Sequence, residues 1–174
     1  QIELHVVDER VARLAPRALG LGFSPRVPSR DFVDLLLGEG AVPMATARKL
    51  TLSRVPLDPE AAGWLGATLN FPSLRSLRLC ENRLQPPSPA PLLNGRALAA
   101  LRALMIQGSD IGDDGARAVA KAPCAPILES LTLQQAKLTA DGAAALAEGD
   151  PFPARTHLDL NWNDVGAKGL ERLV

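Results

Sequence analysis

The chain has 174 residues, of which 47% are hydrophobic, and its 19 basic and 19 acidic residues balance to a formal net charge of zero. This apolar fraction is sufficient for one packed domain and excludes a globally disordered chain. The lack of a basic surplus argues against a nucleic-acid partner. No apolar run approaches the roughly 20 residues that a membrane-spanning helix needs, so we expect no membrane association through such a helix.

Two further features of the chain concern its setting. Its two cysteines, Cys80 and Cys124, are too few for a secreted disulfide scaffold, so we expect a reducing, cytoplasmic location. The chain begins at Gln1 rather than Met and stops at Val174 inside an amphipathic run. We therefore expect it to be contiguous with further repeats or domains of a longer protein.

Residues 1–46 follow no regular period. Apolar residues alternate over residues 2–6, as they do in a β-strand, and residues 29–37 predict a capped helix. The tripeptide Leu19-Gly-Leu21 is a candidate strand core about 31 residues ahead of the first regular one. We interpret this region as one or two divergent repeats or an N-terminal capping region.

Residues 47–174 contain a 27-residue repeat, which appears in two sets of columns. The first set is a pair of aliphatic residues separated by one position, namely Leu50/Leu52, Leu77/Leu79, Leu104/Ile106, Leu131/Leu133 and Leu158/Leu160. The second set is a downstream column of small residues, namely Ala61, Ser88, Gly115, Gly142 and Gly169. Two patterns that keep the same phase over five units make a chance period implausible.

Each repeat predicts one strand followed by one helix. In the aliphatic pair both side chains face the same side of a strand, which predicts strands near residues 49–53, 76–80, 103–107, 130–134 and 157–161. Downstream, apolar residues recur at helical spacing, and Thr139 and Asp58 are placed to cap two of the helices. The small column is expected to let each helix approach the strand layer closely. One such unit cannot bury its own apolar face, so neighbouring units must stack.

These motifs resemble leucine-rich-repeat proteins, and within them the helix-containing, ribonuclease-inhibitor-like class. The resemblance is strongest in the last repeat, from Leu158-Asp-Leu-Asn-Trp-Asn to Leu173, and in Ile111-Gly-Asp-Asp-Gly. It implies an α/β fold: a right-handed, curved solenoid with a parallel sheet on the concave side and helices on the convex side. It also implies five repeats over residues 47–174, the last of them truncated.

Two features of the sequence depart from this pattern, a proline-rich segment and the asparagine column. Prolines crowd residues 86–91 where a helix should begin, so we expect an irregular segment there, with a helix only from about Pro91 or Leu92. A proline-rich docking motif is a less favoured alternative. The family's asparagine after the strand is replaced in three of five repeats, as the column Val55, Asn82, Ser109, Ala136 and Asn163 shows. We expect water to satisfy the turn at Val55 and at Ala136.

No catalytic or metal-binding motif stands out. The two histidines, His5 and His157, are far apart in sequence, and no cluster of His, Cys, Asp and Glu has metal-ligand spacing. Asp113 and Asp114 lie at a predicted helix start, where carboxylates suit the helix dipole better than catalysis. We therefore predict no catalytic residue, no metal and no cofactor, and a chain that is not an enzyme.

The remaining candidate is the concave surface, formed by the residues between and beside the strand leucines. Its predicted charge runs from cationic in the first repeats to neutral in the middle and polar-aromatic at the end. The residues that we expect to bind a partner are the large ones: Arg78, Met105, Asp159, His157 and Trp162. Trp162 has an equally plausible alternative role, which is to cover a further repeat.

The function predicted is a non-catalytic protein–protein interaction scaffold that binds a protein partner of unknown identity on its concave face. One alternative is a recognition module of a larger effector, sensor or enzyme whose catalytic or signalling part lies elsewhere. Another is a GTPase-activating protein, which would need a catalytic loop arginine or asparagine that the sequence does not place. Leucine-rich repeats bind many unrelated partners, so the resemblance alone does not choose among these.

Overall fold

The part of the chain that is described by the computed structural model comprises residues 4–6, 20–23, 48–54, 57–68, 72–87, 89–148 and 150–173. The helix predicted over residues 29–37 lies outside these ranges, as do Val55 and Ser88.

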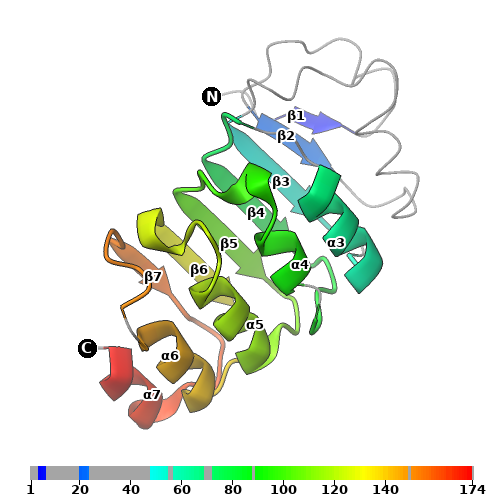
Figure 1. Ribbon diagram of the computed structural model, residues 1–174. Helices are drawn as coiled ribbons and strands as arrows, with labels where there is room; N and C mark the ends of the chain where they lie inside the picture. Colours follow the sequence, from blue (N-terminus) through cyan, green and yellow to red (C-terminus); the bar gives the residue numbers. More distant parts are fainter. Residues whose placement is uncertain are drawn as a thin grey trace.

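The fold is built on a single parallel sheet, whose strands are arranged in chain order (Figure 1). Within the described ranges these strands are β1 (Leu4–Val6), β2 (Gly20–Phe23), β3 (Lys49–Ser53), β4 (Ser76–Cys80), β5 (Ala103–Gln107), β6 (Ser130–Gln134) and β7 (His157–Asp159). Four of the predicted strands therefore have the expected bounds, and the fifth, β7, is two residues shorter. Every neighbouring pair is parallel, as the prediction requires.

The register of the sheet follows the 27-residue period from β3 onward. Leu50 pairs with Leu77, and the same column continues through Leu104, Leu131 and Leu158. Ahead of it, Leu21 pairs with Leu50 and Phe23 with Leu52. The expected strand core at Leu19 and Leu21 is therefore wrong by two residues, because Leu21 is the first member of the pair and Phe23 supplies the second.

The helices lie side by side along one face of the sheet (Figure 1). They are α3 (Pro59–Thr68), α4 (Pro89–Leu93), α5 (Gly112–Ala120), α6 (Ala140–Ala147) and α7 (Gly166–Leu173), with 3-10 turns at Arg96–Leu98 and Ala125–Ile127. The two predicted caps are confirmed. Asp58 Oδ1 accepts from the Ala61 N–H at 2.8 Å, and Thr139 Oγ1 accepts from the Asp141 N–H at 3.2 Å.

The proline-rich repeat contains a helix that begins two residues earlier than expected, at Pro89 rather than Pro91. Its five residues place Pro89 and Pro91 within the first turn, where no intrahelical N–H bond is lost and the fixed φ of proline suits the helix. The helix is short because prolines also occupy the positions before it.

The hydrophobic core lies between the sheet and the helices and runs continuously through the repeats. The strand leucines from β3 to β6 are at most 2% exposed, and they pack with helix residues such as Leu65, Leu92, Val119 and Leu146. In the last repeat Leu158 and Leu160 are only partly buried, because β7 is the last strand of the described sheet and has a neighbouring strand on one side only. Each repeat thus completes the core of the one before it.

At Gly142 and Gly169 the small column also makes room for the preceding helix, a contact that was not expected, whereas a Cβ on Gly115 would meet Ile111 of its own repeat. A Cβ on Gly142 would lie 2.3 Å from Asp113 Oδ1, which belongs to the preceding helix. A Cβ on Gly169 would lie 3.1 Å from the Ala140 Cα of the preceding helix and 2.5 Å from Val165 Cγ1. In these two repeats the missing side chain admits the neighbouring helix rather than the strand layer.

Candidate functional site

The face of the sheet opposite the helices, here called the open sheet face, presents the side chains that alternate with the buried leucines. The central row is Thr51, Arg78, Met105, Thr132 and Asp159, which pair with one another across successive strands. Arg78 is exposed and Met105 is half-buried. This row is the central part of the predicted concave surface.

Four of the five predicted binding residues meet in one hollow of this face. The hollow has a volume of about 260 Å³, and its floor is formed by residues of β4 to β7. Its lining includes Arg78, Met105, His157 and Asp159. Because strands lie about 4.8 Å apart, the row from Arg78 to Asp159 spans about 14 Å. The row is therefore long enough for a short peptide segment to lie across it.

Asp159 is held in place at the far end of the hollow. Its Oδ2 accepts a hydrogen bond from Gln134 Nε2 at 2.6 Å, and its Oδ1 accepts one from the Asn161 N–H at 2.9 Å. Beside it, Thr132 is only 5% exposed, although it lies on the open face. Met105 and Asp159, which are longer, pair with it in register on either side, so Thr132 forms the floor of the hollow and not a contact point.

Trp162 does not line the hollow, but it is 85% exposed and lies three residues after the end of β7. Its backbone is left-handed, and so is that of every equivalent residue, with φ between +48° and +62° at Arg54, Glu81, Gly108, Gln135 and Trp162. In the first four of these repeats the N–H of this residue donates to a carbonyl of the next repeat. The left-handed turn thus keeps the ladder bonded while the chain leaves the strand. Sequence reasoning missed it, since only Gly108 signals a positive φ.

Comparisons with known proteins agree with this geometry. The family described as Leucine Rich repeat matches residues 100–120 and 156–174. The chain folds as a leucine-rich-repeat solenoid. Among solved structures, an internalin from Listeria monocytogenes is similar to this solenoid, with a TM-score of 0.51 and 16% sequence identity. The similarity covers 98% of this chain and 49% of the internalin chain, so the solenoid spans about half the length of that protein. A comparison with curated proteins finds no match.

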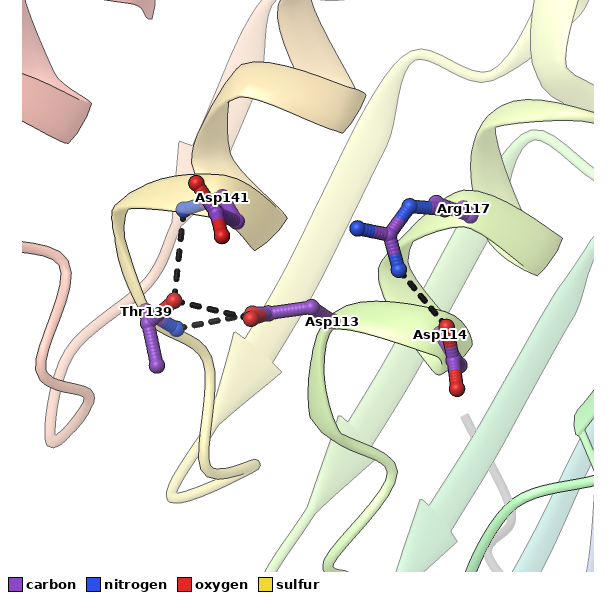
Figure 2. A network of polar contacts seen from close by, with 5 residues as sticks. All are labelled: Asp113, Asp114, Arg117, Thr139 and Asp141. Carbon is purple, nitrogen blue, oxygen red and sulfur yellow. Dashed lines mark hydrogen bonds and ion pairs between the residues drawn. The ribbon is translucent and has the colours of Figure 1, made fainter.

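The paired aspartates at the start of α5 stabilise the solenoid. Asp113 accepts from the Thr139 N–H at 2.9 Å and from the Thr139 hydroxyl at 2.8 Å, while Thr139 Oγ1 accepts from the Asp141 N–H (Figure 2). Asp113 thereby joins α5 to the turn that starts α6. Asp114 instead forms a 2.6 Å ion pair with Arg117 of its own helix. The structure supports the helix-terminus reading of both carboxylates.

Replacing Asp113 with alanine is expected to lower the free energy of unfolding by about 1–2 kcal/mol, because two charge-assisted hydrogen bonds between repeats are lost. Asp114→Ala is the matched control. It removes the same helix-dipole benefit but only an exposed ion pair, so its cost should be about 0.5 kcal/mol or less. Urea denaturation of both variants measures the difference. Equal losses would contradict the role assigned to Asp113.

The chemistry of the described side chains gives no other site. Burial raises the pKa of Cys124 to about 11, and burial is also the main cause that raises the pKa of Cys80, against a lowering by Arg78. Neither cysteine therefore favours the nucleophilic thiolate. His157 begins β7, three strands away from Cys80 in β4. In the ranges that the structure describes, no group of three or more His, Cys, Asp or Glu could hold a metal ion, and no helix has the length and apolarity to cross a membrane.

Proposed function

We propose that this solenoid is a non-catalytic scaffold that binds a protein partner on its open sheet face. Leucine-rich-repeat domains typically mediate protein binding, and the observation that carries the finer proposal is the hollow in the open face. This hollow brings together four side chains from β4, β5 and β7: the exposed Arg78, the half-buried Met105, His157 and the hydrogen-bonded Asp159. Such a mixture of apolar and polar groups is typical of a protein interface.

Other features of the open face support this proposal. The other face of the sheet is covered by helices, so only the open face offers a broad surface on rigid strands. Trp162, at the end of that face, presents an exposed aromatic side chain of the kind that anchors protein interfaces. Arg78, Met105, Asp159 and His157 complete the proposed contact set.

We further infer that the repeats belong to the ribonuclease-inhibitor-like class, which is supported by the 27-residue period and by the helices α5, α6 and α7. We also propose that residues 1–46 form divergent repeats or a capping region ahead of five regular repeats. The two thiols, both free, suit a cytoplasmic setting.

The test is quantitative co-purification with the wild-type chain and two open-face variants, Trp162→Ala and Met105→Ala. A partner that docks on this face should lose about 2 kcal/mol of binding free energy, roughly a 30-fold loss of affinity, with Trp162→Ala. The physical reason is that large, well-packed side chains contribute most of the binding energy of an interface. Circular dichroism checks that each variant keeps its fold.

Two controls accompany this test. Ser53→Ala changes a small side chain of the same face and should leave binding nearly unchanged. Lys121→Ala changes an exposed side chain beside α5, on the helical side. A partner that ignored both open-face variants but was released by Lys121→Ala would place the binding surface on the helices and refute the proposal.

A further inference from the structure

Charge is segregated along the open sheet face. The segments that hold β3 and β4, residues 48–54 and 75–81, contain five basic side chains and one acidic side chain. The corresponding segments of β5, β6 and β7, residues 102–108, 129–135 and 156–162, contain one basic and two acidic side chains. The whole chain is neutral, so this end of the face is positive by arrangement and not because of a general basic surplus.

At the edge where the strands begin, one column places arginines at its first three described positions, Arg48, Arg75 and Arg102, and a glutamate, Glu129, at the fourth. Three ion pairs join equivalent positions of adjacent repeats: Arg54–Glu81 at 3.7 Å, Arg102–Glu129 at 3.0 Å and Lys137–Asp110 at 2.6 Å. The second of these pairs leaves Arg48 and Arg75 as neighbouring cations at the start of the same column, where the backbone N–H groups of Arg75 and Arg102 donate to the Arg48 and Arg75 carbonyls. Cations are thus held next to one another in the first repeats.

In the part of the chain that the structure describes, the arginines at this end other than Arg54 have no carboxylate partner. The guanidinium groups of Arg48 and Arg78, both exposed, make no hydrogen bond or ion pair with any residue that the structure describes. Arg75 donates to the Pro72 and Leu74 carbonyls and to no described carboxylate. Stacked cations repel one another, and a bound carboxylate would relieve that repulsion.

We propose that the open sheet face binds an extended acidic segment of its protein partner, an inference that rests on the proposed function. The acidic side chains lie against Arg48, Arg75 and Arg78, and an aliphatic side chain beyond them lies over Met105. Arg78 and Met105 are paired in register, so these two subsites are adjacent. An extended chain rises about 3.3 Å per residue, so about four residues span the row from Arg78 to Asp159.

The position of the acidic residues within the bound segment follows from the other end of the hollow. The Asp159 carboxylate is negative and already accepts two hydrogen bonds, from Gln134 and from the Asn161 N–H, so it repels a further acid. An acidic segment therefore binds with its charge toward β3 and β4 and its uncharged part toward β7. A nucleic acid would need phosphate contacts along its whole length, which the acidic end of the face does not offer.

The experiment is selection of a random peptide display library on the immobilised full chain, followed by anisotropy measurements with the enriched peptides. Enriched peptides should carry adjacent Asp or Glu residues beside an aliphatic residue. Arg78→Glu or Arg48→Glu should weaken their binding at least about 10-fold, whereas Arg78→Lys should keep most of it. The matched control is Arg96→Glu, which reverses an exposed arginine in the 3-10 turn between α4 and β5 and should change binding less than about 2-fold.

A second measurement does not depend on the folding of any variant. Replacing the acidic residues of an enriched peptide by their amides should weaken binding to the wild-type chain at least about 10-fold. The proposal is overturned if no peptide is enriched, if enriched peptides lack acidic residues, or if a single-stranded oligonucleotide binds as tightly with the same dependence on Arg78. If the enriched peptides contain no acidic residue and bind the Met105→Ala variant more weakly than the wild type, the acidic-segment proposal is refuted, but the proposed function is not. Peptides indifferent to every open-face variant would reject both.

Discussion

Replacing Leu131 with alanine is expected to lower the free energy of unfolding by roughly 2–5 kcal/mol. Leu131 is fully buried, and its column continues through Leu104 on one side and Leu158 on the other. The truncation removes apolar contacts from a core shared by three repeats and leaves a cavity that rigid strands on both sides cannot close. Urea denaturation followed by circular dichroism measures the loss.

Two comparisons make this expectation specific. Gln107→Ala changes a half-buried residue of the open face in the neighbouring strand and should cost about 0.5 kcal/mol or less. Leu158→Ala, in the partly buried last member of the same column, should cost less than Leu131→Ala because fewer contacts are lost. If Gln107→Ala proved as costly as Leu131→Ala, the assignment of inward and outward strand positions would be wrong.

The strand ladder could be predicted from the sequence because two independent physical constraints coincide there. A strand alternates its side chains, and each repeat must match the previous one in register to share a core. Four of five predicted strands have the observed bounds for this reason. Residues 19–23 lack the 27-residue spacing, so nothing distinguished the pair Leu19/Leu21 from Leu21/Phe23 until the register was seen.

The candidate surface could be predicted in part. Alternation alone places Arg78, Met105 and Asp159 on one face, and the register then brings His157 into the same hollow. Alternation does not reveal that Thr132 is covered, since burial depends on the length of the neighbouring side chains. Nor does it reveal the left-handed turn after each strand, because residues such as Glu81 and Gln135 carry no conformational signal.

The prediction for the asparagine column was incomplete: Asn163 Nδ2 donates to the Leu160 and Asn161 carbonyls of its own turn, as expected, but its Oδ1 serves another repeat. Each asparagine was expected to satisfy its own turn, which left the turn at Ala136 to water. In fact Asn163 Oδ1 accepts from the Ala136 N–H at 2.9 Å and from the Leu138 N–H at 3.1 Å. The amide therefore serves the preceding repeat as well as its own, so the residue at position 136 does not determine whether its own turn is satisfied.

Replacing Asn163 with alanine is accordingly expected to lower the free energy of unfolding by about 2–4 kcal/mol, because partly buried backbone groups of two repeats lose their partners. Besides its two accepted bonds, the side chain donates from Nδ2 to the Leu133 carbonyl at 2.6 Å and to the Leu160 carbonyl at 2.9 Å. Asn163→Asp replaces the donor by a carboxylate oxygen that repels the Leu133 and Leu160 carbonyls, so it should also be clearly less stable than the wild type. Urea denaturation measures all three.

The matched control for this prediction is Asn161→Ala, two residues earlier in the same repeat. Asn161 is exposed, and its backbone forms its hydrogen bonds within the described residues: its N–H donates to Asp159, and its carbonyl accepts from the Gln135 N–H. Alanine preserves both groups, so the cost should stay at about 0.5 kcal/mol or less. A similar loss of stability in Asn161→Ala and Asn163→Ala would mean that the hydrogen bonds of the Asn163 side chain contribute nothing to stability. A loss confined to Asn163→Ala would show that one side chain stabilises the contact between the repeats of β6 and β7, in addition to the leucines that these repeats share.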